Sequence, residues 1–166
     1  DIQYVAATFG ASVITTNAGK GIIPESHPLN LGTTLTQPSI QEHLSQADVV
    51  LAIGTEFADT DSYNHKHSFT GKLIRIDIDQ KKLTDLYPAD VAIHADAKLA
   101  VKELKQLTPV TKRSAETTQL KVSQLKKQIL DNVSPLEQLH HHLLKTLRQT
   151  LADDAVVVSD MTQLAY

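Results

Sequence analysis

Apolar runs alternate with helical patterns along the first hundred residues, and this alternation predicts a parallel sheet. Four runs of β-branched and aliphatic residues are typical of strands: 13–16, 49–53, 73–79 and 91–94. The run 49–53 is apolar throughout, which indicates a strand buried on both faces. Amphipathic stretches separate the strands, and this order favours an α/β fold with a mostly parallel sheet.

Residues that favour helix N-caps stand before the helical patterns: Asp1, Ser39, Asp96 and Ser134. Glu137 follows Ser134 at the third position, so this pair predicts a capping box. Another helix is predicted over about 116–130 from its apolar spacing. Residues 22–38 carry prolines and little periodicity, so we expect a connection that runs over the surface.

Polar and glycine residues follow the strands at the edge where a ligand would bind. Gly54, Thr55 and Glu56 come after one strand, and Asp77 and Asp79 end another. Ligands of open α/β sheets bind beyond the carboxyl ends of the strands, so this edge is the predicted site. The glycine-rich turn after the first strand could cradle phosphate through its N–H groups, but it lacks the Walker spacing.

Other polar groups suggest chemistry, and we interpret each as structural. The histidines at 140–142 are consecutive in a predicted helix, so they point in different directions and cannot share a metal. His65 and His67 could bind zinc as an extended pair, but no third ligand is evident. Asp59 and Asp61 resemble paired carboxylates, although acidic residues in turns serve more often as caps.

Composition narrows the classes of function. A chain of 166 residues with 41% apolar and 21% charged residues fits one globular domain, with or without an appendage. A net charge of -3 gives no reason to expect nucleic acid. The absence of cysteine excludes disulfides and a cysteine nucleophile. No apolar run reaches the ~20 residues of a membrane helix, so we expect a soluble, cytoplasmic protein with no membrane partner.

Four segments in fixed order carry a resemblance to a known family: TTNAGKGIIPESHPLNLG, ADVVLAIGTEF, GKLIRIDID and VAIHADAKLAVKEL. Together they resemble the central domain of thiamine diphosphate-dependent enzymes, a family that includes acetolactate synthase and benzoylformate decarboxylase. The resemblance covers about residues 4–106. The tail AVVVSDMTQLAY resembles the start of the domain that holds the cofactor diphosphate, most of all in members that decarboxylate 5-guanidino-2-oxopentanoate.

The resemblance implies a domain organisation. Residues 1–109 would form the Rossmann-like, three-layer central domain, without its first strand. Residues 110–152 would be a helical linker region, and 153–166 the truncated start of the C-terminal domain with a terminal strand. In the intact enzyme, thiamine diphosphate and magnesium would be bound, with Thr162 and Gln163 near the diphosphate. A hydroxyl and an amide after a strand suit phosphate oxygens.

Some members of the family also bind FAD or ADP, and the resemblance places Asp77 and Asp96 at the adenosine, with Asp79 as a further candidate. Flavin-binding members carry basic and glycine-histidine residues at positions where this chain has Glu56, Thr60 and Thr33-Thr34-Leu35. We therefore expect an empty or vestigial nucleotide site.

The family implies an enzyme that decarboxylates or couples 2-oxo acids as a homodimer or homotetramer. This chain would supply scaffold and interface. It holds neither the family's activating glutamate nor its GDG magnesium motif, so we predict no catalytic or metal residue and no activity from the 166 residues alone. An alternative is a free-standing nucleotide-binding module of the sirtuin-like or electron-transfer-flavoprotein-like kind.

In the family a further strand lies between those equivalent to 13–16 and 49–53. Its absence would leave two strand edges unpaired inside the fold, and unpaired backbone N–H and C=O groups in a buried position are unfavourable. We predict that Ala155–Val158, from the same chain or from a neighbour, fills this position.

Overall fold

The computed structural model of the chain describes residues 1–63, 66–107, 109 and 114–160. The chain forms two compact units, Asp1–Lys126 and Lys127–Tyr166. The elements follow in this order: α1 (Ile2–Phe9), β1 (Val13–Ile14), β2 (Asn30–Gly32), α2 (Pro38–Ser45), β3 (Val49–Ile53), α3 (Asp59–Ser62), β4 (Lys72–Asp77), the 3-10 helix η1 (Gln80–Thr84), β5 (Val91–His94), α4 (Ala97–Leu104), α5 (Ala115–Asn132) and α6 (Pro135–Thr150).

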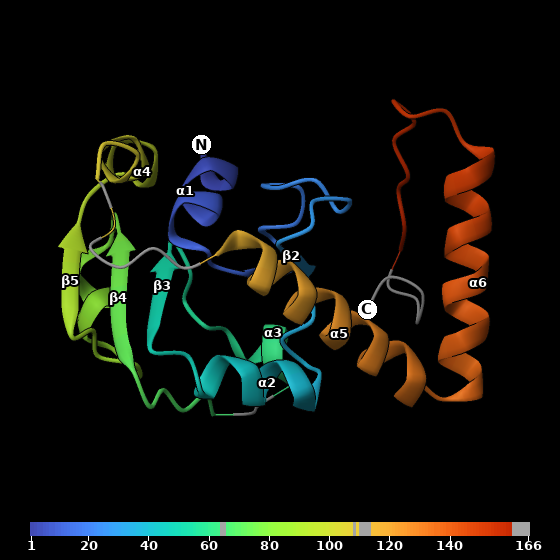
Figure 1. The fold of residues 1–166 in the computed structure, drawn as a ribbon, viewed down its shortest axis with the longest axis horizontal. Helices are drawn as coiled ribbons and strands as arrows, with labels where there is room; N and C mark the ends of the chain where they lie inside the picture. The colour runs from blue at the N-terminus through green and yellow to red at the C-terminus, as the bar shows by residue number, and fades with distance from the viewer. Residues whose placement is uncertain (64–65, 108, 110–113, 161–166) are drawn as a thin grey trace. The chain divides into compact units, whose positions relative to one another are not determined.

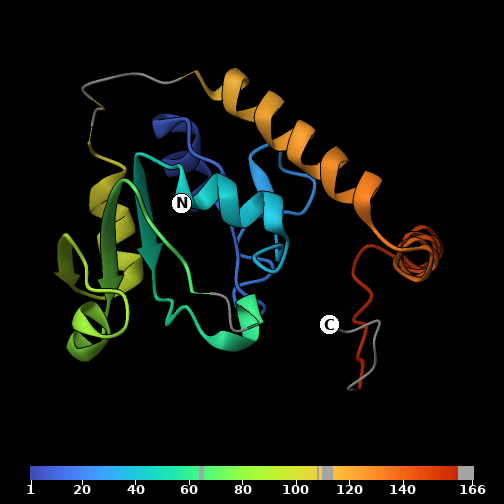
Figure 2. The same cartoon turned by 90° about the horizontal axis from the view of Figure 1, so that it is seen from below.

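The strands of the first unit run parallel, and the α/β, Rossmann-like fold is confirmed. Figure 1 shows β3, β4 and β5 side by side, with Leu51 paired to Ile74 and Ile74 to Val91. β1 pairs with β2 in a second, two-stranded sheet. Helices α1 and α4 lie side by side in Figure 1 and contact each other, and α4 also contacts β4, beside which it is seen in Figure 2.

The sheet is interrupted between β1 and β3, because no ladder joins these strands among the described residues. Ala155–Val158, the run predicted to fill this position, has no strand geometry, and Val156 and Val158 are 87% and 90% exposed. The predicted terminal strand is therefore wrong: no strand is described in the second unit for it to pair with, and a lone run cannot form a ladder. Insertion from a neighbouring copy stays a prediction.

The segment 22–38 is buried in part, whereas the sequence predicted a connection that runs over the surface: residues 23, 29–32 and 35 are buried, and residues 22, 24–26, 28 and 38 are exposed. Ile23, Leu29 and Leu31 are at most 1% exposed, and the segment contains β2. The Asn30 amide nitrogen donates to the Pro24 carbonyl at 3.1 Å, and its amide oxygen accepts from the Gly32 N–H at 2.8 Å. These bonds satisfy the polar groups of an irregular segment that has no helical or strand periodicity.

Two of the four predicted N-caps, Asp96 and Ser134, form cap hydrogen bonds, whereas Asp1 precedes α1 without a side-chain cap bond. Asp96 Oδ1 accepts from the Leu99 N–H at 3.0 Å, and Ser134 forms the predicted capping box with Glu137. α2 begins at Pro38 rather than after Ser39, because proline suits the first helical turn, where its missing N–H is not needed. No helix among the described residues is long and apolar enough to cross a membrane.

Arg75 is buried in the middle of β4, with 1% of its surface exposed. Its Nη1 donates to Asp85 Oδ1 at 2.6 Å and to the Tyr87 carbonyl at 2.8 Å, and its Nη2 donates to the Thr55 carbonyl at 3.1 Å. Its guanidinium carbon lies 5.5 Å from the centroid of the Phe57 ring. One side chain thus joins the segment after β3 to the segment before β5.

We expect the Arg75–Asp85 contact to make stability depend on pH. Partial burial acts to raise the pKa of the Asp85 carboxyl, but the hydrogen bonds from Arg75 and the Tyr87 N–H hold it below its ordinary value. The contact therefore contributes stability above the unfolded-state pKa of about 4, and this contribution is lost as the pH falls through the lower folded-state pKa.

Asp85→Asn should accordingly reduce the free energy of unfolding near neutral pH by about 2 kcal/mol. The difference from the wild type should shrink in urea unfolding below about pH 4. The control is Asp131→Asn, which removes an exposed partner of Lys127 and should change little at either pH. A difference for Asp85→Asn that is the same at both pH values would contradict the prediction.

Gly71 is required by the close approach of two chain segments. A Cβ at this position would lie 2.2 Å from the carbonyl oxygens of Ala47 and Asp48, just before β3. Gly71→Ala should therefore destabilise the fold by about 2 kcal/mol or more in thermal or urea unfolding. Gly19→Ala is the matched control, since its Cβ would meet only the Thr16 residue, at 3.1 Å or more. Equal stability of the two variants would contradict this prediction.

Candidate functional site

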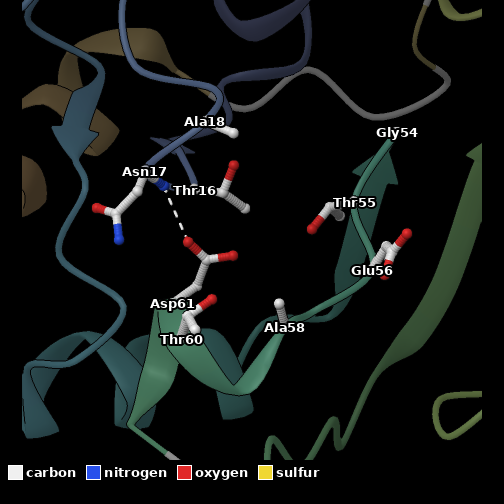
Figure 3. A pocket seen from close by; sticks show the side chains of 9 residues that line it. All are labelled: Thr16, Asn17, Ala18, Gly54, Thr55, Glu56, Ala58, Thr60 and Asp61. Atoms are coloured by element: carbon white, nitrogen blue, oxygen red, sulfur yellow. Dashed lines mark hydrogen bonds between the residues drawn. The ribbon is translucent and has the colours of Figure 1, made fainter.

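A pocket of about 300 Å³ lies at the carboxyl ends of β1 and β3 (Figure 3). Its lining comes from three segments: the turn after β1, the segment after β3, and α3. The lining residues are Thr16, Asn17, Ala18, Gly54, Thr55, Glu56, Ala58, Thr60 and Asp61. The position agrees with the sheet edge predicted from Gly54, Thr55 and Glu56.

Two N–H groups of the turn after β1, those of Asn17 and Gly19, donate to other groups of the protein. Asn17 N–H donates to Asp61 Oδ1 at 2.9 Å, and Figure 3 shows the Asp61 carboxylate pointing from α3 toward this turn. Gly19 N–H donates to Thr16 Oγ1 at 3.0 Å and to the Thr16 carbonyl at 3.1 Å. Asp61 lines the pocket and Asp59 does not, so these two residues do not act as a carboxylate pair there.

Glu56 lies across the pocket from Asp61 (Figure 3). Its Oε2 is 3.0 Å from Lys82 Nζ, and this contact raises the pKa of Lys82. No lysine or arginine is among the residues that line the pocket. The ionised groups that line the pocket are therefore carboxylates, which is unfavourable for a phosphate ligand.

Asp77 and Asp96, the predicted adenosine contacts, do not line this pocket. Asp77 is buried at the end of β4, and its Oδ1 accepts from the Asp79 N–H at 2.8 Å. Asp96 caps α4, and Asp79 Oδ1 accepts from the Lys81 N–H at 2.9 Å to cap η1. The three carboxylates each complete a local turn or cap.

The remaining predicted site residues fall into two groups. Thr162, Gln163 and His65 lie outside the described residues. His67 packs with the rings of Phe57 and Tyr87, at centroid distances of 5.7 and 5.9 Å. Within the described part of the chain, no group of three or more histidine and acidic residues could hold a metal ion.

A contact between Ser12 and His43 was not anticipated from the sequence. Ser12 Oγ lies 3.0 Å from His43 Nε2 and joins α2 to the segment before β1. Burial, followed by the nearby charge of Lys121, lowers the pKa of His43. The two residues are 31 positions apart and neither belongs to a motif, so only the fold brings them together.

Comparison with known proteins identifies the class. The model of the thiamine pyrophosphate enzyme central domain matches residues 1–104. "Probable 2-ketoarginine decarboxylase AruI" of Pseudomonas aeruginosa is 40% identical over 165 residues, which is 99% of this chain and 30% of that protein. A "Probable acetolactate synthase large subunit" of Methanococcus aeolicus is 39% identical over 109 residues, 63% of this chain and 18% of that protein.

A third relative, the "Putative thiamine pyrophosphate-containing protein YdaP" of Bacillus subtilis, is 26% identical over 160 residues, 91% of this chain and 27% of that protein.

The fold and the pocket define a Rossmann-like domain with its polar edge at the carboxyl ends of the strands. The chain belongs to the family of thiamine pyrophosphate enzyme central domains, as the sequence resemblance indicated. The alternative of a free-standing nucleotide-binding module is not supported. The chain spans about a third or less of the length of these relatives.

Proposed function

We propose that this chain is the central-domain part of a thiamine diphosphate-dependent enzyme that decarboxylates or couples 2-oxo acids. The match to the 2-ketoarginine decarboxylase carries the proposal, because it extends over 99% of the chain, beyond the central domain itself. The acetolactate synthase match supports the same cofactor class and leaves both reaction types within the proposal. A 2-oxo acid is the substrate class proposed.

In this proposal the residues that the structure describes form a scaffold and do not take part in the reaction. Thiamine diphosphate, usually with magnesium, supplies the electron sink for loss of carbon dioxide when it is bound. We propose that Thr162 and Gln163 approach its diphosphate, since a hydroxyl and an amide suit phosphate oxygens. The Arg75 contacts join the segment after β3, which lines the pocket, to the segment before β5. In our proposal this domain is the scaffold on which neighbouring domains are placed.

We propose that FAD or ADP is not a working ligand of this domain. Asp77 and Asp96 are the positions at which an adenosine would bind, at the ends of β4 and β5. Both already accept local hydrogen bonds from backbone N–H groups. The lining of the nearby pocket supplies no cation for a diphosphate.

The organisation proposed for the longer protein follows the family. Residues 1–109 form the central domain, 110–152 a helical linker region, and 153–166 the start of the diphosphate-binding domain. We also propose a cytoplasmic homodimer or homotetramer. An exposed leucine face on α6 supports further contacts: its leucines, Leu136, Leu139, Leu143, Leu144 and Leu147, are 40–62% exposed.

A chimera tests the proposal. The aligned segment of the Pseudomonas aeruginosa relative would be replaced by this chain and the release of carbon dioxide from 2-ketoarginine measured. We expect activity that depends on thiamine diphosphate, with kcat within about tenfold of the parent's, because a scaffold of the same fold should preserve the cofactor and substrate contacts made by other domains.

Two controls accompany the chimera. The 166-residue chain alone should release no carbon dioxide and give no heat with thiamine diphosphate and magnesium in calorimetry. The chimera with Gly71→Ala should lose activity in proportion to its loss of folded protein. A chimera that folds and assembles like the parent but has no activity would contradict the proposed function.

A further inference from the structure

The pocket at the ends of β1 and β3 includes backbone N–H groups that could bind an anion, but one of them already donates to a side chain of the protein. In a glycine-rich turn, backbone N–H groups form a concave site for phosphate oxygens. Here Asn17 N–H donates to Asp61 Oδ1 at 2.9 Å, so a carboxylate occupies the place of a phosphate oxygen. Figure 3 shows this contact within the pocket.

The N–H groups of Gly19 and Lys20 also have acceptors within the turn. Gly19 N–H donates to both oxygens of Thr16, at 3.0 and 3.1 Å, and the Lys20 N–H donates to the Asn17 carbonyl at 3.4 Å. An incoming diphosphate would have to break these contacts before it could accept from the N–H groups of Asn17, Gly19 or Lys20. Breaking them without replacement would leave donors unpaired, which is unfavourable.

The charges of the pocket lining also disfavour a diphosphate. A diphosphate at this position would lie between Asp61 and Glu56, on opposite sides of the pocket. Lys82, which does not line the pocket, is already paired with the Glu56 carboxylate at 3.0 Å. A bound anion would therefore meet two negative charges and no positive charge from the pocket lining.

We propose that the Asp61 carboxylate blocks the place at which a phosphate would bind the turn after β1, and that Asp61 and Glu56 together exclude nucleotide diphosphates. The carboxylate of α3 takes the place of a ligand by joining α3 to the turn after β1. The inference concerns ligand exclusion alone and does not depend on the decarboxylase activity proposed above.

Variants of the 166-residue chain separate charge from hydrogen bonding. Asp61→Asn removes the charge and keeps an oxygen that can accept from Asn17 N–H, whereas Asp61→Ala removes both. Glu56→Gln removes the second charge. Asp59→Asn is the matched control, because it makes the same charge change in the same helix at a residue that does not line the pocket.

Titration of backbone amide chemical shifts with ADP, pyrophosphate and adenosine gives the readout. The wild type and Asp59→Asn should bind ADP and pyrophosphate weakly or not at all, with Kd above about 1 mM. Each charge removed from the pocket should tighten ADP and pyrophosphate binding by about tenfold, with shifts centred on the turn 16–19. Adenosine is uncharged, so its binding should be the same in all variants.

Three results would overturn the inference. The first is micromolar binding of ADP by the wild type. The second is a folded Asp61→Asn, Glu56→Gln double variant, judged by circular dichroism, that binds ADP no tighter than Asp59→Asn. The third is an equal gain in affinity for adenosine and ADP, since that would show that charge is not the cause. If Asp61→Ala fails to fold, the Asp61→Asn and Glu56→Gln variants still carry the test.

Discussion

The buried guanidinium of Arg75 is the constraint on which the ligand edge of this domain depends. Burying a charged group is costly unless it is paired and hydrogen-bonded, and here the guanidinium, 1% exposed, donates to three acceptors from two segments, one of them a carboxylate. Thr55 belongs to the segment that enters the pocket, and Asp85 and Tyr87 lead into β5. If Arg75 is removed, the Asp85 carboxylate and two carbonyl oxygens lose their donor together.

The Phe57 ring extends this arrangement into the apolar core. It is packed against the rings of Phe69 and Tyr87 at centroid distances of 5.6 and 5.1 Å, and the guanidinium lies over its face. Phe57 adopts a positive φ of 52°, which a non-glycine residue holds only when its surroundings impose it. The pocket lining between Gly54 and Asp61 is therefore positioned by packing and by Arg75, without the need for a ligand. This agrees with a scaffold role for the domain.

Periodicity predicted the parts of the fold that repeat locally. The runs 49–53 and 91–94 are β3 and β5, and Ser134 with Glu137 forms the predicted box, because strands and caps depend on residues close in sequence. β2 was missed because its three residues, Asn30–Gly32, include a single apolar side chain, that of Leu31, and so show no strand periodicity. Ala155–Val158 has the composition of a strand, but composition cannot supply a neighbouring strand with which to pair.

In the candidate site, too, the sequence predicted the features that depend on neighbouring residues and missed those that depend on residues far apart in the chain. Gly54, Thr55 and Glu56 could be placed on the ligand edge because the rule for α/β sheets concerns strand ends. The contact of Asp61 with Asn17 joins residues 44 positions apart, and the contacts of Arg75 reach 10 to 20 positions along the chain. No local pattern encodes such contacts, so the sequence indicated a structural role such as a cap for Asp61 and did not single out Arg75.

Amide hydrogen exchange of Arg75→Met tests most directly whether Arg75 holds the ligand edge. Protection of the amides at 55–57 and of the Tyr87 and Ala89 amides should fall by about 100-fold, the effect of losing a buried charged donor worth about 3 kcal/mol. Amides of α6, in the other unit, should exchange as in the wild type. Unchanged protection at both segments in Arg75→Met would contradict the account.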